Sequence, residues 1–441
     1  MRIRALTAVA TAALLVPATA MAQSYPAPTD PGKGPKAKGK GTTLTVCKQR
    51  RCDFKGIQKA IDAATGRDTI KVKAGTYREG LKVVGSRYDG LKLVGGPRVN
   101  LDGKGLKRGA AQNGVLVNNA DGVTVKGFHA RHYKANCFFV TNAVGYTLTQ
   151  LVAERCGVYG IYAFNSKGGE MSKSEAFYNN DSGFYVGQTP LQKGRVKRTI
   201  VKGVKSWGNV LGFSGTNMHY VTITKSQWFN NGAGIVPNAL DTEKFPPPGD
   251  NVIANNDIFW NNFNFYFGAP FQIPEQSAAA IPYPIGVGIL LFGSQDTTVE
   301  GNRIFGNWLG GFAEVPAVQL AGSEDPALKE ASVLRNNVVR NNDFGLGGND
   351  LNGRDMVYDG SGSGNCFEGN SVRSPNLPAS NSTFAPCPGP PANTLDPAVL
   401  PEALSWVLAG NRADPTTFES AWLRHPHAAR KGAKPLERFP K

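Results

Sequence analysis

Four short segments decide the fold, and they read Gly114-Val-Leu-Val, Cys137-Phe-Phe-Val, Gly160-Ile-Tyr-Ala and Gly183-Phe-Tyr-Val. Each segment begins 23 residues after the one before it. The series continues with less regular spacing at Gly212-Phe-Ser-Gly, Gly234-Ile-Val-Pro, Asn264-Phe-Tyr-Phe, Gly288-Ile-Leu-Leu and Gly311-Phe-Ala-Glu. A fixed period in the low twenties, with a short apolar segment in each period, is typical of a solenoid in which every repeat forms one coil. The pattern therefore predicts a β-solenoid.

A second strand in each repeat supports this prediction because two columns of like residues follow it. We anchor this strand at Val125, Leu148, Met171, Val201, Ile223, Ile253, Val299 and Val333. Eight residues after each anchor the sequence reads Tyr133, Cys156, Asn179, Asn209, Asn231, Asn261, Asn307 and Asn341. Three residues after each anchor it reads Phe128, Leu151, Ser174, Val204, Ser226, Asn256, Asn302 and Asn336. Successive coils lie about 4.8 Å apart, so asparagines in one column can hydrogen-bond to one another inside the solenoid.

The first coil needs a cap, because the exposed edges of its strands would otherwise pair with other chains. Residues 53–64 have Phe54, Ile57, Ala60 and Ile61 at helical spacing, which predicts an amphipathic helix over this end. The solenoid itself is predicted to cover residues 44–372.

The flanking segments differ in composition from the solenoid. Residues 23–43 are rich in Pro, Gly and Lys and are expected to be a disordered linker. Residues 373–441 form a C-terminal extension in which 401–408 and 415–423 read as two short helices, the second capped by Asp414.

One further stretch gives the repeats a family resemblance. Residues 57–77 read IQKAIDAATGRDTIKVKAGTY and precede repeats of the form GI-x-x…N-x-I…NN. This pattern resembles the pectate-lyase-like right-handed parallel β-helix superfamily, and it is most similar to the branch with polysaccharide lyases and alginate epimerases. The resemblance covers residues 44–372. It implies an all-β, right-handed parallel β-helix, but one scaffold of this kind hosts many activities.

The catalytic motifs of characterised relatives are absent from this sequence. Alginate epimerases of this fold carry Asp-Pro-His-Asp or Asp-Pro-His-Glu, polygalacturonase-type hydrolases need Asp-Asp and Gly-His-Gly, and the best-known pectate lyases have Arg-x-Pro-x-x-Arg. None of these runs occurs. No characterised active site can therefore be transferred to this chain.

The first residues predict export. Arg2 and Arg4 precede an apolar run from Ala5 to Ala18, and Ala20-Met21-Ala22 has the small-x-small pattern of a signal peptidase site. We expect residues 1–22 to be a signal peptide cleaved after Ala22, and the protein to be secreted. No second apolar stretch has the length of a membrane span.

Six cysteines fit an oxidising destination. The simplest of the fifteen possible connectivities pairs nearest neighbours, which are Cys47 with Cys52, Cys137 with Cys156, and Cys366 with Cys387. The other pairings stay open. A zinc site is not favoured, because no Cys-x-x-Cys pair is present and the histidines are scattered.

The formal net charge of +16 suggests a polyanionic partner. Outside the cytoplasm this would be an acidic polysaccharide or another extracellular polyanion rather than nucleic acid, for which no motif is present. Solubility alone is the other explanation of the charge. We expect a monomer.

The departures from the 23-residue step point to a binding site. Excess length appears at about residues 187–195, 237–250, 268–285 and 313–330. In the register above, all four insertions follow the same strand of their coils, so they should rise along one edge and wall a groove.

The residues of these insertions supply the candidate substrate-binding groups. Cations at Lys193, Arg195, Arg198, Lys202 and Lys205 could neutralise the carboxylates of a bound uronan. Asp241 and Glu243 could be substrate-binding acids, a catalytic acid pair or Ca²⁺ ligands. No other cofactor is expected, and the sequence leaves any metal site unassigned.

The candidate catalytic residues are His219, Tyr220 and Lys197, which could together supply a base, an acid and a cation against the uronate carboxylate. A second cluster, His129, Arg131 and His132, is expected to point outward, whereas the neighbouring Tyr133 falls in the inward column. Two functions remain open. One is a polysaccharide lyase or C5-epimerase, and the other is a non-catalytic cell-surface or matrix protein that binds carbohydrate in the same groove.

Overall fold

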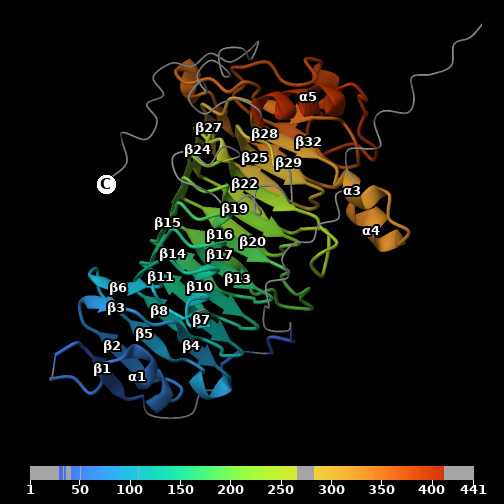
Figure 1. The fold of residues 1–441 in the computed structure, drawn as a ribbon. Coiled ribbons are helices and arrows are strands. Elements are labelled where there is room, and N and C mark those ends of the chain that lie inside the picture. Colours follow the sequence, from blue (N-terminus) through green and yellow to red (C-terminus); the bar gives the residue numbers. More distant parts are fainter. Residues whose placement is uncertain are drawn as a thin grey trace, which may run out of the picture.

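The computed structural model describes residues 29–32, 34–35, 41–49, 51–107, 109–265 and 283–411. Over these residues the chain winds into a right-handed parallel β-helix, with the first coils at one end of the column and the last coils at the other (Figure 1). Each coil passes in order through three parallel sheets, which we call A, B and C. The all-β fold class and the superfamily resemblance are confirmed.

Sheet A contains twelve strands in the described part of the chain. They are β1 (Thr43–Val46), β2 (Thr69–Val72), β5 (Lys92–Val94), β8 (Thr124–Lys126), β11 (Thr147–Thr149), β14 (Glu170–Ser172), β17 (Thr199–Lys202), β20 (Val221–Thr224), β23 (Val252–Ala254), β26 (Thr298–Glu300), β29 (Val338–Arg340) and β32 (Cys366–Glu368).

Sheet B contains ten strands within the same residues. They are β3 (Gly75–Tyr77), β6 (Val99–Asp102), β9 (His129–Arg131), β12 (Val152–Glu154), β15 (Glu175–Phe177), β18 (Lys205–Trp207), β21 (Gln227–Phe229), β24 (Asp257–Phe259), β27 (Arg303–Phe305) and β30 (Asp343–Phe344).

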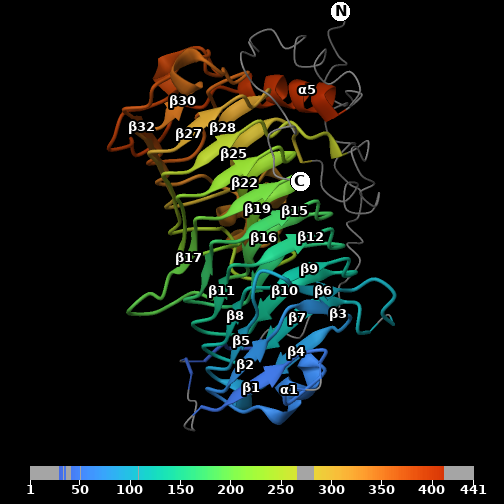
Figure 2. The same ribbon diagram turned by 90° about the vertical axis from the view of Figure 1, so that its left-hand side faces the viewer.

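Sheet C also contains ten described strands, and Figure 2 shows most of them stacked along the column. They are β4 (Leu81–Val84), β7 (Asn113–Asn118), β10 (Asn136–Thr141), β13 (Ile161–Phe164), β16 (Ser182–Gly187), β19 (Leu211–Thr216), β22 (Ala233–Asn238), β25 (Val287–Phe292), β28 (Gly310–Val315) and β31 (Met356–Tyr358). The four segments that share the 23-residue step lie in β7, β10, β13 and β16, as predicted.

The predicted asparagine columns are present inside the solenoid. The Asn231 side-chain amide donates to Oδ1 of Asn261 at 3.1 Å, and the Asn261 amide donates to Oδ1 of Asn307 at 3.1 Å. A second column joins Asn256 to Asn302 at 3.0 Å in the same way. These amides satisfy buried polar groups at each bend, so every coil constrains the next.

The last member of each column was predicted incorrectly. Asn307 bonds to Asn352 rather than stacking with Asn341, and Asn302 bonds to Asn342 rather than stacking with Asn336. The strand partner of Val299 is Val339, so Val333 is not an anchor. The cause is added length in this coil, because two helices precede β29 and the short 3₁₀ helix η3 (Leu346–Gly348) follows β30.

One predicted strand is also wrong. Asn264 and Phe265 form no strand, and β22 pairs directly with β25. This segment belongs to a long insertion between β24 and β25. Its sequence resembles that of a strand because Phe265 packs on the outside of sheet C, where it is buried among apolar side chains.

Helices cap and cover the solenoid. The predicted N-terminal cap is helix α1 (Ile57–Ala63), which buries Ile57, Ala60 and Ile61 against the first coil. The first predicted C-terminal helix is α5 (Val399–Asn411), and the second, 415–423, lies outside the described residues. The other helices within the described residues are α3 (Val318–Ala321), α4 (Pro326–Ala331), η1 (Ser86–Tyr88) and η4 (Asn381–Thr383).

Three disulfides pair nearest neighbours, Cys47 with Cys52, Cys137 with Cys156, and Cys366 with Cys387. These bonds fit a non-cytosolic location. Among the described residues, no helix has both the length and the apolar composition needed to cross a membrane.

Candidate functional site

The insertions border sheet C along both of its edges. Three lie between a strand of sheet C and a strand of sheet A, at residues 188–198, 239–251 and 316–337. The fourth connects β24 of sheet B to β25 of sheet C, and most of it, including residues 268–282 of the predicted 268–285 loop, lies outside the described residues. The expectation that all four insertions leave the solenoid at one corner is therefore wrong.

The half of sheet C nearest the C-terminus is covered on its outer face. Val236, Leu290 and Ala313 belong to an apolar cluster with Trp406 and Val407 of α5. Figure 2 shows α5 at this end of the column. This part of the sheet is therefore occupied by packing.

The middle of the outer face of sheet C carries a cluster of aromatic rings, which we call the aromatic cluster: Phe139, Tyr159, Tyr162, Phe164 and Tyr185. The rings of Phe139 and Tyr162 are stacked, with centroids 4.5 Å apart, and the centroids of Tyr162 and Tyr185 are 4.8 Å apart. The in-register pairing of β10, β13 and β16 places these rings one above another. All of these side chains are buried except that of Tyr159, which is partly buried.

Glu243 of the 239–251 insertion reaches this cluster. The Tyr185 hydroxyl group donates a hydrogen bond to Oε1 of Glu243, while Oε2 is inaccessible and makes no hydrogen bond of good geometry in the described structure. Burial outweighs the hydrogen bond from Tyr185 and raises the pKa of Glu243 to about 8. Burial also raises the pKa of Tyr185 well above its ordinary value. At neutral pH both groups keep their protons.

Amide side chains hold this insertion over the sheet. Asn217 donates to the backbone oxygens of Leu240 and Glu243, both at 2.7 Å. The backbone N–H of Lys244 donates to Oε1 of Gln188 at 3.1 Å. Asn217 and Gln188 each occupy a left-handed bend that ends a sheet C strand, and both are buried beneath this insertion.

A second acid lies at the start of β16. The Ser182 hydroxyl group donates to Oδ1 of Asp181 at 2.6 Å, and burial raises the pKa of Asp181 to about 6. Ser182 occupies the rung next to Tyr159, whose ring centroid lies 4.6 Å from that of Tyr185. Asp181 immediately precedes the strand that carries Tyr185, and burial raises its pKa to a lower value than that of Glu243.

The candidate catalytic residues lie at the corner between sheets C and A. His219 is buried under the 239–251 insertion, with Nε2 2.8 Å from the backbone oxygen of Phe245, and burial lowers its pKa. The ring of Tyr220 lies 5.7 Å from that of His219. The pairing of Thr199 with Val221 places Lys197 in the rung before His219. The three residues are neighbours along this corner, and their catalytic roles stay a prediction.

The candidate binding cations are spread over several faces instead of forming one line. Lys193 and Arg195 are exposed in the 188–198 insertion, and Arg198 donates to the backbone oxygen of Asp250 at 2.8 Å. Lys202 is on sheet A, where it pairs with Glu170 at 3.0 Å, and Lys205 is on sheet B.

The candidate acids Asp241 and Glu243 also differ in environment. Asp241 is exposed, whereas the carboxyl group of Glu243 is inaccessible. Their role as Ca²⁺ ligands stays a prediction. Tyr162 and Tyr185 were missed as candidates, although each follows an inward residue in a quoted segment and so had to point outward.

The outward histidine cluster on sheet B is engaged in ion pairs. His129 lies 3.0 Å from Glu154, and His132 lies 3.0 Å from Asp102, which also pairs with Arg131 at 3.2 Å. Tyr133 points inward, as expected, and its hydroxyl group donates to the backbone oxygen of Glu79 at 2.6 Å.

Part of the chain matches a known protein family, and the fold is similar to that of solved structures. Residues 98–270 match the model of a family described as periplasmic copper-binding protein (NosD). No curated protein matches the sequence significantly. The A-module of the mannuronan C-5 epimerase AlgE4 of Azotobacter vinelandii is similar in structure, with 16% identity, a TM-score of 0.50, and coverage of 72% of this chain and 90% of that one.

Two further solved structures resemble the chain. The A-module of AlgE6, a mannuronan C-5 epimerase of the same organism, gives 16% identity and a TM-score of 0.47, and covers 73% of this chain and 92% of that one. A rhamnogalacturonan lyase gives 15% identity and a TM-score of 0.43, with 60% and 76% covered. At such identities the similarity concerns the fold alone. The chain thus has the right-handed β-helix fold of pectate-lyase-like proteins.

The name of the matched family raises the question of a copper ion. In the part of the chain that the structure describes, no group of three or more His, Cys, Asp or Glu side chains is arranged to hold a metal. His129, His132 and His219 face three different partners, and all six cysteines form disulfides. The donor set of the described residues does not fit a copper site.

Proposed function

We propose that this protein binds an acidic polysaccharide on the outer face of sheet C and acts on it as a lyase or a C5-epimerase. The observation that carries the proposal is the carboxyl group of Glu243, which lies beside the hydroxyl group of Tyr185 on an aromatic face and whose pKa is raised by burial. The fold shared with the AlgE4 A-module, a mannuronan C-5 epimerase, supports this class of ligand.

The aromatic cluster suits a sugar polymer. Ligand sites are lined mainly by apolar and aromatic side chains, with a few polar groups that fix orientation. Lys193 and Arg195, in the neighbouring insertion, add positive charge that attracts carboxylates. Four of the five rings are buried, so binding requires the 239–251 insertion to move, as lids do in many enzymes.

The protonated state of Glu243 matches the requirement of the reaction. In β-elimination a base removes the C5 proton of a uronate, the C4–C5 double bond forms, and the C4–O4 bond breaks as O4 gains a proton. In epimerisation the carbanion at C5 instead gains a proton on its opposite face. Both reactions build negative charge on the uronate carboxylate, and a neutral carboxyl group can donate a hydrogen bond to it.

The different pKa values of Asp181, Glu243 and Tyr185 suggest which group is the base and which is the acid. Between a pKa of about 6 and a pKa of about 8, Asp181 is ionised while Glu243 is protonated. We assign Asp181 as the base that removes the C5 proton. Tyr185 keeps its proton because its pKa is raised, and we assign it as the acid.

The first experiment is a panel of polyuronates incubated with the protein, with and without Ca²⁺. Absorbance of the unsaturated product reports a lyase, and exchange of solvent deuterium into intact polymer reports an epimerase. If every polyuronate is retained by the protein but gives neither signal, the alternative holds, namely a non-catalytic carbohydrate-binding protein.

Three substitutions test the assignment of roles. Asp181→Asn should lower kcat by about 10²–10⁴, the usual contribution of a general base. Glu243→Gln keeps a neutral donor, so activity should persist at alkaline pH values where the wild type loses it. Thr242→Ala, an exposed change in the same insertion, is the control and should leave kcat unchanged. Full activity of the Asp181 variant would remove the assignment.

The candidate catalytic residues at the corner between sheets C and A provide an alternative assignment, which a separate variant tests. If His219 is the base, with Tyr220 and Lys197 as acid and cation, His219→Ala should abolish turnover at unchanged substrate affinity. We expect it to retain the chemistry, because Nε2 faces the Phe245 backbone. We further propose that the protein is a secreted monomer, and the three disulfides support the location.

A further inference from the structure

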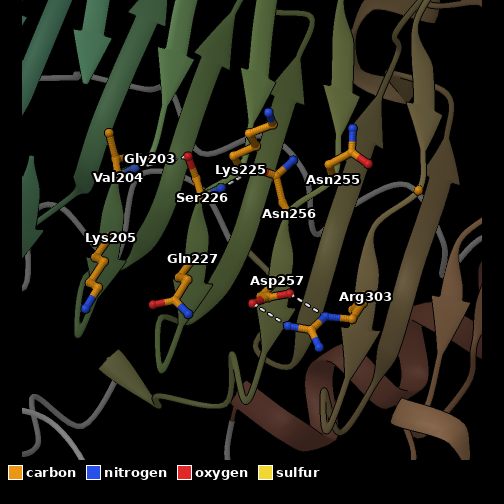
Figure 3. A pocket seen from close by; sticks show the side chains of 11 residues that line it. Gly203, Val204, Lys205, Lys225, Ser226, Gln227, Asn255, Asn256, Asp257 and Arg303 are labelled. Atoms are coloured by element: carbon orange, nitrogen blue, oxygen red, sulfur yellow. Dashed lines mark hydrogen bonds and ion pairs between the residues drawn. The ribbon is translucent and has the colours of Figure 1, made fainter. Parts of the chain in front are cut away.

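A second surface feature lies at the corner between sheets A and B, away from the aromatic cluster. There the structure has an open cavity of about 500 Å³ lined by residues of adjacent coils (Figure 3). Its side chains include Lys205, Lys225, Gln227, Asp257 and Arg303. We call it the corner pocket.

The register of sheet B explains why these side chains gather. Lys205 pairs with Gln227, Gln227 with Asp257, and Asp257 with Arg303. Figure 3 shows the four side chains in one row across the strands. Lys225 occupies the left-handed bend between sheets A and B, with a φ of 52°, and is exposed. Polar side chains therefore repeat here at the coil spacing of about 4.8 Å.

The charges in the corner pocket are unbalanced. Arg303 holds the carboxylate of Asp257 with two hydrogen bonds, of 2.7 and 2.8 Å, so this acid is already neutralised. Nearby, Lys202 is paired with Glu170. Across the described residues, neither Lys205 nor Lys225 makes an ion pair or a side-chain hydrogen bond, although both are exposed. Glu175, the strand partner of Lys205 on its other side, accepts a hydrogen bond from the indole of Trp207. The pocket thus presents two ammonium groups that have no ion-pair partner among the described residues.

We propose that the corner pocket is a secondary anion site that binds the carboxylate or sulfate groups of an acidic polysaccharide. Lys205 and Lys225 supply the charge, the Gln227 amide supplies a neutral donor, and Arg303 is held in place by Asp257. Donors repeated at the coil spacing favour a linear polymer with an anionic group on successive sugars over a single small anion. The choice of an acidic polysaccharide as the ligand rests on the proposed function. The inference that the pocket binds anions rests on its charges alone.

The test compares two double variants of equal charge. Lys205→Gln/Lys225→Gln removes the ammonium groups of the corner pocket, and Lys55→Gln/Lys59→Gln removes two exposed lysines near the N-terminal cap. Titration calorimetry with polygalacturonate and with heparin, at low and at physiological salt, distinguishes carboxylate from sulfate recognition, and neutral dextran reports non-ionic binding.

We expect Lys205→Gln/Lys225→Gln to raise Kd about tenfold for at least one polyanion and to reduce the dependence of Kd on salt. Lys55→Gln/Lys59→Gln should change Kd little. Equal Kd values for the two variants, or equal binding of dextran and polyanions by the wild type, would overturn the inference. The thermal unfolding midpoint of each variant confirms that it is folded.

The outcome is separable from that of the proposed function. Asp181→Asn should lower kcat while leaving Kd for the corner pocket unchanged, and Lys205→Gln/Lys225→Gln should keep kcat at saturating polymer. If no polyuronate is turned over but Lys205→Gln/Lys225→Gln still loses affinity, the proposed reaction fails and this anion site stands.

Discussion

The hydroxyl group of Tyr185 donates a hydrogen bond to Glu243, and this contact joins strand β16 to an insertion 58 residues later in the chain. Strand β16 is part of the wall of the solenoid, whereas the 239–251 insertion is not required to complete a coil. Because Tyr185 is buried and Oε2 of Glu243 is inaccessible to solvent, the contact affects stability as well as the proposed chemistry.

Replacing Tyr185 with Phe should lower the free energy of unfolding by about 1–3 kcal/mol, because an oxygen of Glu243 loses its donor in a buried place. Denaturant titration measures the difference. Tyr220→Phe is the matched control, since no hydrogen bond of its hydroxyl group occurs within the described residues, and it should change stability by less than about 0.5 kcal/mol. Equal effects of the two changes would contradict the role given to this contact.

The regular part of the fold could be predicted because its physical cause is local and repeated. In each coil up to Asn307 the same offset separates the strand anchor from the bend, so counting along the chain is enough to align the asparagines. Beyond that point α3, α4 and η3 add residues between strands, and a fixed offset reaches Asn341 in a bend instead of Asn352 in the column.

The site was predictable only in part. Alternation along β16 places Phe184 inside and Tyr185 outside, so the aromatic face was within reach of sequence reasoning. The position of Glu243 was not, because it depends on Asn217 and Gln188 drawing the insertion back over sheet C. The letters of the sequence do not tell an exposed acid from a buried one, and only the path of the loop gives Asp241 and Glu243 their different environments.

Glu314 should make the stability of the protein depend on pH. It is fully buried, its carboxyl group accepts a hydrogen bond of 2.9 Å from Asn337, and burial raises its pKa to about 8. The unfolded chain releases this proton near a pKa of about 4.3, whereas the folded chain keeps it. This contribution to stability is therefore complete below the unfolded pKa and is lost as the pH rises toward about 8.

Glu314→Gln should remove this pH dependence. The difference in unfolding free energy between variant and wild type should change across this range by up to about 1.4 kcal/mol per pH unit, in the direction that favours the variant at high pH. Glu324→Gln, at an exposed position, should run parallel to the wild type. Parallel curves for Glu314→Gln as well would show that the buried carboxyl group is ionised in the folded protein.

The asparagine column can be tested at two positions that only the structure distinguishes. Asn261 Oδ1 accepts from the backbone and from the side chain of Asn231. Asn261→Leu leaves these buried donors unpaired and should cost about 2–5 kcal/mol. Asn341 lies exposed in a left-handed bend, with a φ of 54°, so Asn341→Gly should change stability by less than about 0.5 kcal/mol. A large loss at Asn341 would support the register expected from sequence instead.

The disulfide between Cys137 and Cys156 occupies the position where the same column would continue. Cys156 follows Tyr133 and precedes Asn179, and its backbone N–H already donates to Oδ1 of Asn179 at 3.0 Å. Cys137→Ala/Cys156→Ala should lower the unfolding free energy by about 3 kcal/mol, because a cross-link over a sequence separation of 19 residues no longer restricts the unfolded chain.

Cys137→Ala/Cys156→Asn should recover about 1 kcal/mol of that loss. Its new amide can donate to Asn179 as Asn179 does to Asn209 at 3.0 Å, which extends the column by one coil. Denaturant titrations of both double variants under identical conditions measure the difference. If Cys137→Ala/Cys156→Asn is no more stable than Cys137→Ala/Cys156→Ala, hydrogen bonds between coils do not by themselves stabilise this end of the solenoid. Packing of the apolar side chains in successive coils must then do so.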